Sequence, residues 1–257
     1  MSALHLTIDG SVAELRLDNP AKLNSLTVPM LEALDAHCAT LERNGDVRAV
    51  IVTGTGEKAF CTGADIAAWG PMAPFDFARH WVREGHRIFD RLARLGKPTI
   101  AALNGHAFGG GLELALTCDL RVCTPRARLG MPPARLGVVY SHTGLRRFVD
   151  AIGSARTREL FFTARPVDAA EALSWGLVNE VVSDVEARSV ALASEIAALA
   201  PLSQRGNKRA LQALAPGVDP ALEAELHAQR DAAFRSADFA EGVRAFIEKR
   251  QPEWRGR

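Results

Sequence analysis

Apolar and polar residues alternate along residues 11–18, which predicts a strand with one buried side and one side facing solvent. After Thr27, which is suited to cap a helix, apolar residues recur at helical spacing. These residues are Met30, Leu31, Leu34, Cys38 and Leu41. Short apolar segments at 47–53 and 98–103 are typical of strands buried in a parallel sheet, and the pattern between them predicts a long helix over residues 76–95.

The order of these segments alternates strands with helices, as in folds where helices cover a parallel sheet, so the expected fold class is α/β. From about residue 184 the pattern becomes continuously helical, with joints between helices at Pro201, Pro216, Gly217 and Pro220. We therefore expect a core over residues 1–183 and a helical C-terminal region over residues 184–257. This region would pack on the core or on a neighbouring subunit.

The composition fits a folded α/β protein, because 47% of the 257 residues are hydrophobic and 24% are charged. Thirty-one Lys and Arg residues nearly balance 30 Asp and Glu residues, which argues against nucleic acid or an anionic membrane as a partner. The four cysteines lack C-x-x-C spacing and the N-terminus lacks a signal peptide, so we expect a reduced, cytoplasmic protein. No apolar run reaches the roughly 18 residues of a membrane span, and no histidine pair has metal-ligand spacing.

Three consecutive glycines, Gly109 to Gly111, stand where an apolar strand gives way to a helical run. They leave backbone N–H groups unshielded at a helix N-terminus, where the partial positive charge favours an anion. A plain strand-to-helix turn remains an alternative. Dinucleotide and P-loop motifs do not fit, since Leu114 stands where the third small residue is needed and no Gly-Lys-Ser/Thr follows. The remaining interpretation is that backbone N–H groups of this turn donate hydrogen bonds to an oxyanion that forms during a reaction.

Glu113 lies one turn inside the helix that follows these glycines. Its carboxylate either interacts with the helix dipole alone or is buried among the neighbouring leucines and alanine. In an apolar pocket its pKa would be raised, which suits proton transfer. His106, inside the same turn, is interpreted as structural.

A second loop, residues 58–66, also offers small residues that leave the backbone accessible. It follows the 47–53 strand, so it lies near the carboxyl ends of parallel strands, where ligands bind in open α/β sheets. Taken singly, it reads as a surface loop in which Asp65 caps a helix.

Several short motifs are spaced along the chain from about residue 10 to its C-terminus. They are Lys22-Leu-Asn-Ser-Leu, Lys58-Ala-Phe-Cys-Thr-Gly-Ala-Asp-Ile, Asn104-Gly-x-Ala-x-Gly-Gly-Gly-x-Glu-Leu, Cys118-Asp119, Phe162-Thr-Ala, Ala172-x-x-x-Gly-Leu-Val-Asn and Glu241-Gly-x-x-Ala-Phe-x-Glu-Lys-Arg. In this order they resemble the signatures of the crotonase (enoyl-CoA hydratase/isomerase) superfamily. The resemblance implies a ββα-spiral core, a helical trimerisation region, and a homotrimer or dimer of trimers.

The resemblance also implies an acyl-CoA thioester as substrate, with no other cofactor because coenzyme A is part of that substrate. The N–H groups of Ala64 and Gly110 would bind the thioester oxygen as it becomes an enolate. Contacts to the acyl group or coenzyme A are implied for Ala21, Lys22, Leu23, Thr62, Gly63, Asp65, Ile66, Gly109, Pro133, Phe246 and Lys249. Of these, Phe246 and Lys249 would reach the substrate of a neighbouring subunit.

One position departs from typical hydratases, which pair two glutamates to activate water and deliver a proton. Glu113 matches the first, but Pro133 stands at the place of the second and cannot transfer protons. We therefore expect isomerisation or decarboxylation through an enolate. The segment Leu136-Gly-Val-x-Tyr140 is similar to the methylmalonyl-CoA decarboxylase branch, which makes Tyr140 a second catalytic candidate, although that branch has a histidine where this chain has Ala64.

Two alternatives stay open: a true enoyl-CoA hydratase with one glutamate, and a non-catalytic acyl-CoA binding subunit. Tyr140 is also open to interpretation as a core residue. We expect the basic residues that flank it, Arg135, His142, Arg146 and Arg147, to be solvated. The aromatic residues Trp69, Phe75, Phe77 and Trp81 would line the acyl pocket or merely pack.

Overall fold

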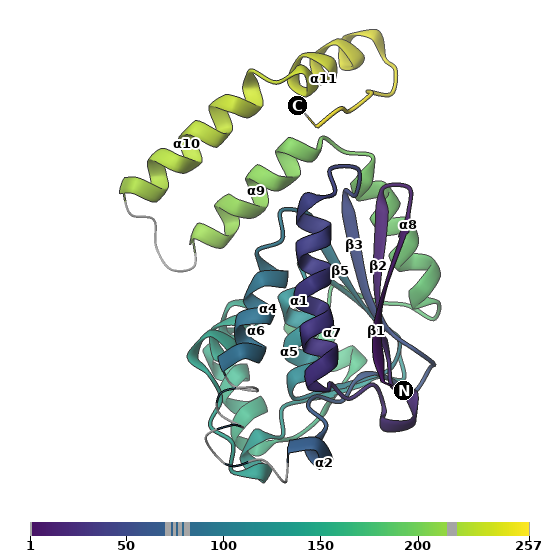
Figure 1. Ribbon diagram of the computed structural model, residues 1–257, viewed down its shortest axis with the longest axis vertical. Helices are drawn as coiled ribbons and strands as arrows, with labels where there is room; N and C mark the ends of the chain where they lie inside the picture. The colour runs from purple at the N-terminus through teal and green to yellow at the C-terminus, as the bar shows by residue number, and fades with distance from the viewer. Residues whose placement is uncertain are drawn as a thin grey trace.

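The computed structural model describes residues 2–69, 73, 76, 79, 83–214 and 220–256. Its central feature is a six-stranded sheet with the strand order β1-β2-β3-β5-β7-β10 (Figure 1). The strands are β1 (Ala3–Asp9), β2 (Val12–Asp18), β3 (Ala49–Gly54), β5 (Thr99–Leu103), β7 (Leu120–Cys123) and β10 (Glu180–Val181). All neighbours pair in parallel except β1 and β2. The strands predicted at 11–18, 47–53 and 98–103 are confirmed.

A second, smaller sheet lies beside the first and has the order β4-β6-β8-β9. Its strands are β4 (Ala59–Cys61), β6 (His106–Phe108), β8 (Arg128–Gly130) and β9 (Val167–Asp168). The chain passes from β3 to β4, from β5 to β6 and from β7 to β8. Each of these three repeats contributes one strand to each sheet before a helix follows. This arrangement is the expected ββα spiral.

Helices pack on the two faces of the larger sheet because its strands are apolar on both sides. Val50 and Val52 of β3 face one core cluster, to which α1 contributes, while Ala49 and Ile51 face α8. The helices of the core are α1 (Val28–Arg43), α2 (Ile66–Trp69), α4 (Gly85–Ala93), α5 (Gly110–Thr117), α6 (His142–Thr163) and α7 (Ala169–Trp175). Thr27 caps α1 as predicted, accepting a hydrogen bond from the Met30 N–H at 3.4 Å. Of the helix predicted over 76–95, α4 covers Gly85–Ala93. The described residues Asp76, Arg79, Arg83 and Glu84 are also helical, and the other residues before Arg83 lie outside the described part of the chain.

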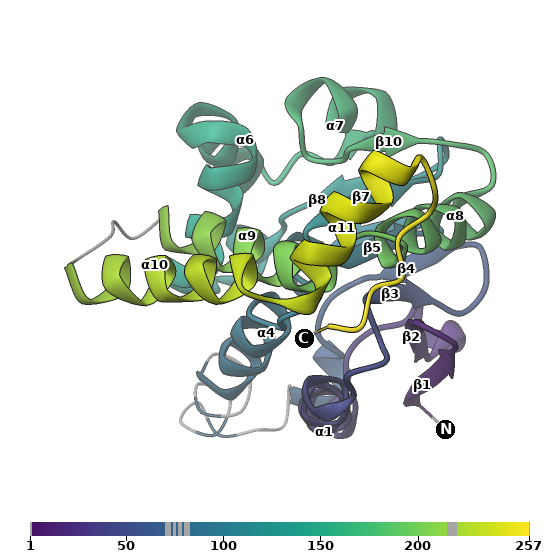
Figure 2. The ribbon, with the colours of Figure 1, turned by 90° about the horizontal axis from the view of Figure 1, so that it is seen from above.

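The chain beyond residue 184 is helical, as predicted, and comprises α8 (Val185–Ala197), α9 (Pro201–Leu214), α10 (Pro220–Phe234) and α11 (Ala237–Glu248). Figure 1 places α10 and α11 at one end of the molecule, beyond the larger sheet, and in the view from above α11 overlaps the strands (Figure 2). The buried Lys208 fixes α9 to the core, since its ammonium binds the Asp119 carboxylate at 2.7 Å and the Lys97 carbonyl at 2.9 Å.

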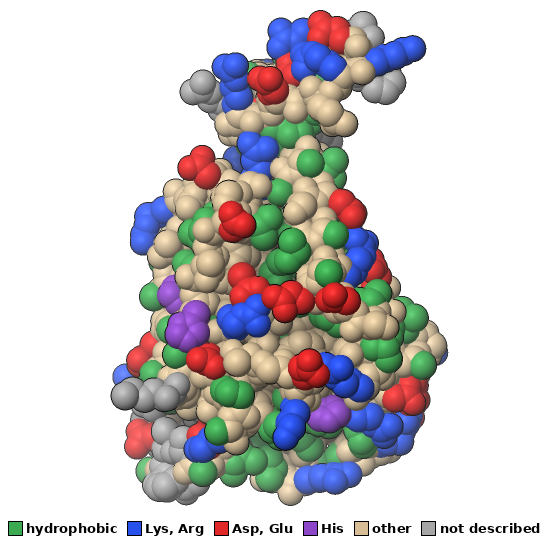
Figure 3. Space-filling model, turned by 90° about the vertical axis from the view of Figure 1, so that its right-hand side faces the viewer, with side chains coloured by type: hydrophobic (Ala, Val, Ile, Leu, Met, Phe, Trp, Pro, Cys, Tyr) green, Lys and Arg blue, Asp and Glu red, His purple; other side chains and the backbone are tan. Residues whose placement is uncertain are grey.

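Acidic and basic side chains are interspersed over the face drawn in Figure 3, in keeping with the near-zero net charge. The four cysteines are unpaired and buried, and burial raises the pKa of each thiol to about 12. Among the described helices, none is long and apolar enough to cross a membrane.

Candidate active site

Two glycine-containing loops approach each other closely at one end of the smaller sheet. Gly109, just before α5, has a φ of +54°, and Gly63, just after β4, has a φ of +90°, a region that favours glycine. A side chain at Gly63 would put its Cβ 3.0 Å from the Phe108 carbonyl oxygen and 3.2 Å from the Gly110 nitrogen. A Cβ at Gly111 would lie 2.1 Å from the Cys61 carbonyl oxygen. Glycine at these positions therefore lets α5 begin directly against β4.

Each loop presents one backbone N–H group at this junction. Leu26 and Ala64 form an isolated parallel β-bridge. The Leu26 N–H donates to the Gly63 carbonyl at 2.7 Å, and the Leu26 carbonyl accepts a hydrogen bond from the Asp65 N–H at 2.9 Å. This pairing does not use the N–H of Ala64 itself. Gly110 is the first residue of α5, so its N–H is one of the four that have no partner within the helix. Two such donors side by side can stabilise a developing oxyanion.

A cavity of about 160 Å³ opens in front of these two residues. Its lining is mainly apolar and is drawn from the two loops, α4 and the segment before α6. The residues with polar side chains in this lining are Thr62, His86, Glu113 and Tyr140. Glu113 is the one carboxylate, and lysine and arginine are absent, among the described residues that line the cavity.

The carboxyl group of Glu113 is 1% exposed, which confirms the expected burial. Its surroundings differ from the apolar pocket that the sequence suggested. Oε1 accepts hydrogen bonds from His86 Nδ1 at 2.9 Å and from Arg147 at 2.6 Å, and Oε2 accepts one from the Tyr140 hydroxyl. The expectation of an apolar environment is therefore wrong, because a buried charge needs polar or charged partners and Glu113 has three.

Arg147, on α6, was expected to be solvated, and that prediction is also wrong. Its side chain is 13% exposed and bridges Glu113 to Asp90 of α4. The other flanking basic residues are exposed and are not among the described residues that line the cavity. Arg135 donates to the Ala164 carbonyl at 3.1 Å, and Arg146 binds Asp150 at 2.6 Å.

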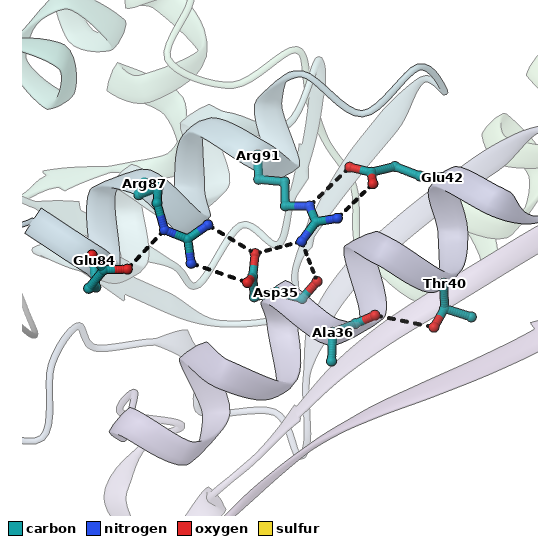
Figure 4. A network of polar contacts seen from close by, with 7 residues as sticks. All are labelled: Asp35, Ala36, Thr40, Glu42, Glu84, Arg87 and Arg91. Carbon is teal, nitrogen blue, oxygen red and sulfur yellow. Dashed lines mark hydrogen bonds and ion pairs between the residues drawn. The ribbon is translucent and has the colours of Figure 1, made fainter.

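Helix α4 supplies His86 and Asp90, and ion pairs to α1 hold this helix in place. Arg87 and Arg91 both bind Asp35, and Arg91 also binds Glu42 at 2.7 Å (Figure 4). His86 and Asp90 are four residues apart and so share another side of α4. Sequence reasoning missed both residues, although the His86/Asp90 and Arg87/Arg91 pairs at this spacing were a visible signal.

Tyr140 lies between these groups, with its ring edge-on to His86 at 5.5 Å and to Phe161 at 5.4 Å between centroids. Burial and the nearby Glu113 charge raise the pKa of Tyr140 well above its ordinary value, so the hydroxyl stays protonated and donates to Glu113. Gly144 makes room for this contact, because a Cβ there would lie 2.7 Å from the Tyr140 ring and 3.0 Å from Glu113 Oε1.

The other predicted residues divide between the cavity and its surroundings. Cavity-lining residues are Thr62, Gly63, Ala64, Ile66, Gly109, Gly110 and Pro133. Thr62 donates to the Leu23 carbonyl at 3.2 Å, and Lys22 binds the buried Asp65 at 2.7 Å, which ties the exposed segment Ala21–Leu23 to the second loop. That loop is partly buried, with Gly63 and Asp65 buried and Ile66 exposed.

Lys249 is exposed just after α11 and is not among the described residues that line the cavity. The side chains of Phe246 and Trp69, and all of Phe75, Phe77 and Trp81, lie outside the described part of the chain. His106 has the structural role expected, since its Nδ1 accepts the Arg128 N–H at 3.0 Å.

Comparison with known proteins places this chain in a family. The family model for enoyl-CoA hydratase/isomerase matches residues 7–257. The chain is 37% identical to a short-chain-enoyl-CoA hydratase of Clostridium acetobutylicum, over 95% of this chain and 94% of that protein. It is also 37% identical to a carnitinyl-CoA dehydratase of Proteus mirabilis, over 99% of both chains. The crystal structure of an enoyl-CoA hydratase from Bacillus anthracis superposes with a TM-score of 0.92 at 33% identity and 99% coverage of both chains. The chain belongs to the enoyl-CoA hydratase/isomerase family, within the crotonase superfamily.

Proposed function

We propose that the site moves a proton next to the carbonyl of an acyl-CoA thioester and stabilises the resulting enolate. The observation that carries this proposal is a single buried carboxylate, Glu113, in a cavity bordered by the Ala64 and Gly110 N–H groups. In this role the two N–H groups donate to the thioester oxygen as it gains negative charge. Removing one donor of this kind typically costs a factor of about 10²–10³ in rate.

The preferred reaction is isomerisation of a 3-enoyl-CoA to a 2-enoyl-CoA. Glu113 removes a proton from the α-carbon, and the electron pair of the broken C–H bond moves toward the thioester oxygen to give a dienolate. The protonated Glu113 then returns the proton to the γ-carbon, and the double bond shifts to the α,β position. One carboxylate suffices for both steps, which fits Pro133 at the place of a second acid.

Decarboxylation is a weaker candidate because of the charges around the cavity. A malonyl-type substrate brings a carboxylate, which would lie near Glu113 with no lysine or arginine among the described lining residues. Arg147 does not compensate, since it is already bound to Glu113 and Asp90. The apolar lining would nevertheless favour release of carbon dioxide, so this reaction belongs in the test.

A second candidate is hydration or dehydration, favoured by the names of the two relatives and by one contact. The Tyr140 hydroxyl bonds to Glu113, so it offers a second proton-bearing group where hydratases use another glutamate. A non-catalytic acyl-CoA binding subunit fits less well, because it would have no need of a buried, fully hydrogen-bonded carboxylate.

The substrate contacts complete the proposal. Coenzyme A would run past Ala21–Leu23 and the loop of Thr62, Gly63 and Asp65, while Ile66, Gly109 and Pro133 border the acyl group. Phe246 and Lys249 would contribute from a neighbouring subunit of a trimer or dimer of trimers.

Parallel assays of the purified protein with a 3-enoyl-CoA, crotonyl-CoA and methylmalonyl-CoA test the proposal. We expect turnover of the 3-enoyl-CoA, and a loss of about 10²–10⁴-fold in kcat for Glu113→Gln, which keeps the shape of the side chain but removes its basicity. Faster turnover of crotonyl-CoA would contradict isomerisation. In that case the Tyr140→Phe variant becomes informative. If its rate of crotonyl-CoA hydration falls more than its rate of isomerisation, Tyr140 has the role of the missing glutamate.

A further inference from the structure

Among the described residues, His86 is the one histidine that contacts Glu113, and histidine is the side-chain type that ordinarily changes its charge near neutral pH. Its Nδ1 lies 2.9 Å from Glu113 Oε1, and its ring forms part of the cavity wall. The His86 side chain is 14% exposed, whereas that of Glu113 is 1% exposed. His86 is therefore more accessible to solvent than the Glu113 carboxylate that it contacts.

The protonation of His86 determines the net charge of the cluster around Glu113. Facing it are the Glu113 carboxylate from α5, Arg147 from α6, Asp90 from its own helix and the neutral Tyr140 hydroxyl. The two carboxylates share a single guanidinium, so the cluster has one net negative charge while His86 is neutral. Protonation of His86 cancels this charge and places a second cation on Glu113 Oε1, the oxygen that already binds Arg147.

We propose that His86 sets the basicity of Glu113, so that the imidazole has to be neutral for Glu113 to remove a proton from the substrate. With a neutral ring, Nδ1–H donates one hydrogen bond and orients the carboxylate. With a charged ring, Glu113 is held in a tight ion pair and is a poor base. His86 is thus a positioning residue that makes the reaction sensitive to pH, and this inference rests on the proposed role of Glu113.

The test is the dependence of kcat/KM on pH between about 5 and 9, measured for the wild type and His86→Gln with whichever acyl-CoA the wild type turns over. Glutamine keeps an N–H donor for Oε1 but does not titrate. The matched control is His37→Gln on α1, because His37 is also half-buried and hydrogen-bonded, to the Leu4 carbonyl at 3.1 Å.

In the wild type, kcat/KM is expected to fall about tenfold per pH unit once His86 is protonated. Because glutamine does not titrate, the acid limb in His86→Gln should move to lower pH, with activity at pH 8 within about tenfold of the wild type. The His37→Gln profile should match the wild type.

Two other outcomes overturn different claims. An acid limb at the same pH in wild type and His86→Gln, with both enzymes active, would overturn the role of His86 and leave the proposed function standing. A wild type that turns over none of the three substrates would overturn the proposed function, and with it the role of His86, since there would be no base to regulate.

Discussion

At the scale of single residues, the buried charge of Glu113 determines how its neighbours are arranged. Its three partners come from separate segments: His86 from α4, Arg147 from α6 and Tyr140 from the loop before α6. Removing one partner of a buried charge pair typically destabilises a protein by about 3–5 kcal/mol, because the other charge is left uncompensated. The same contacts that allow a carboxylate in this cavity therefore also stabilise the fold.

Gly144 offers a residue-scale test of this arrangement. In Gly144→Ala the added methyl group would overlap the Tyr140 ring at 2.7 Å and crowd Glu113 Oε1 at 3.0 Å. Both side chains would have to move, so we expect a loss of about 1–3 kcal/mol in the free energy of unfolding. Because the Tyr140–Glu113 hydrogen bond is disturbed, we also expect kcat to fall at least tenfold. Urea denaturation and the acyl-CoA assay measure the two effects.

Gly206→Ala is the matched control, since Gly206 lies within α9 and a Cβ there meets no atom within 4 Å. Alanine is favoured over glycine in a helix by up to about 1 kcal/mol, so this variant should be as stable as the wild type or more stable. If Gly144→Ala and Gly206→Ala had the same free energy of unfolding and the same kcat, the absence of a side chain at Gly144 would not be needed for the contact between Tyr140 and Glu113.

At the scale of elements, α4 connects the fold to the site because two of its sides have different partners. Arg87 and Arg91 bind α1 (Figure 4). On another side of the helix, His86 contacts Glu113 and Asp90 contacts Arg147. Fixing one side of a short helix limits its rotation, so the ion pairs with α1 also orient the residues in the cavity wall.

The contacts of Asp35 predict a pH dependence of stability. Partial burial raises the pKa of Asp35, but hydrogen bonds from Arg87 and Arg91 outweigh this effect and lower the pKa below its ordinary value. Stability from a lowered carboxyl pKa is present above the pKa of the unfolded chain, about 3.9, and is lost as pH falls through the folded value. Asp35→Asn should thus cost up to about 1 kcal/mol at pH 7, with a gap to the wild type that narrows below pH 4.

Urea denaturation midpoints at pH 7, 4 and 3 measure this gap, with Asp46→Asn as a control at an exposed carboxylate before β3. A constant difference between Asp35→Asn and the wild type at all three pH values would contradict the assignment to the Asp35 charge.

Sequence reasoning succeeded where the signal was local and failed where it depended on distant contacts. The strand at 11–18 and the helix after Thr27 were predicted because their periodicity extends over many residues. The strands of the smaller sheet have only two or three residues each, too few for a pattern, and only the family resemblance indicated them. In the site, the burial of Glu113 was predicted from its flanking residues. Its contacts with His86 and Arg147 join residues 27 and 34 positions apart, and these depend on how α4 and α6 pack.

At the scale of the whole molecule, the C-terminal helices expose apolar side chains beyond the core. Among the described residues of α9, α10 and α11, the large hydrophobic side chains that are at least 47% exposed are Leu211, Leu214, Phe234, Phe239 and Val243. Phe234 and Phe239 pack edge to face at 5.3 Å, so part of this surface is already organised. Exposed apolar groups concentrated in one region commonly mark a protein–protein contact.

The family resemblance implies a trimer or a dimer of trimers, and this surface is suited to such a contact, so we expect the chain of 27.7 kDa to sediment as one of these assemblies. Phe239→Glu combined with Val243→Glu places two charges one turn apart on α11, and burying them at an interface without partners would be unfavourable. This double variant should shift the mass in analytical ultracentrifugation toward that of the single chain. Val190→Glu on α8, where an apolar residue is 48% exposed outside this region, should leave the mass unchanged. A wild type that sediments as a single chain at micromolar concentration would contradict this assembly. The exposed apolar side chains would then be expected to contact a different protein.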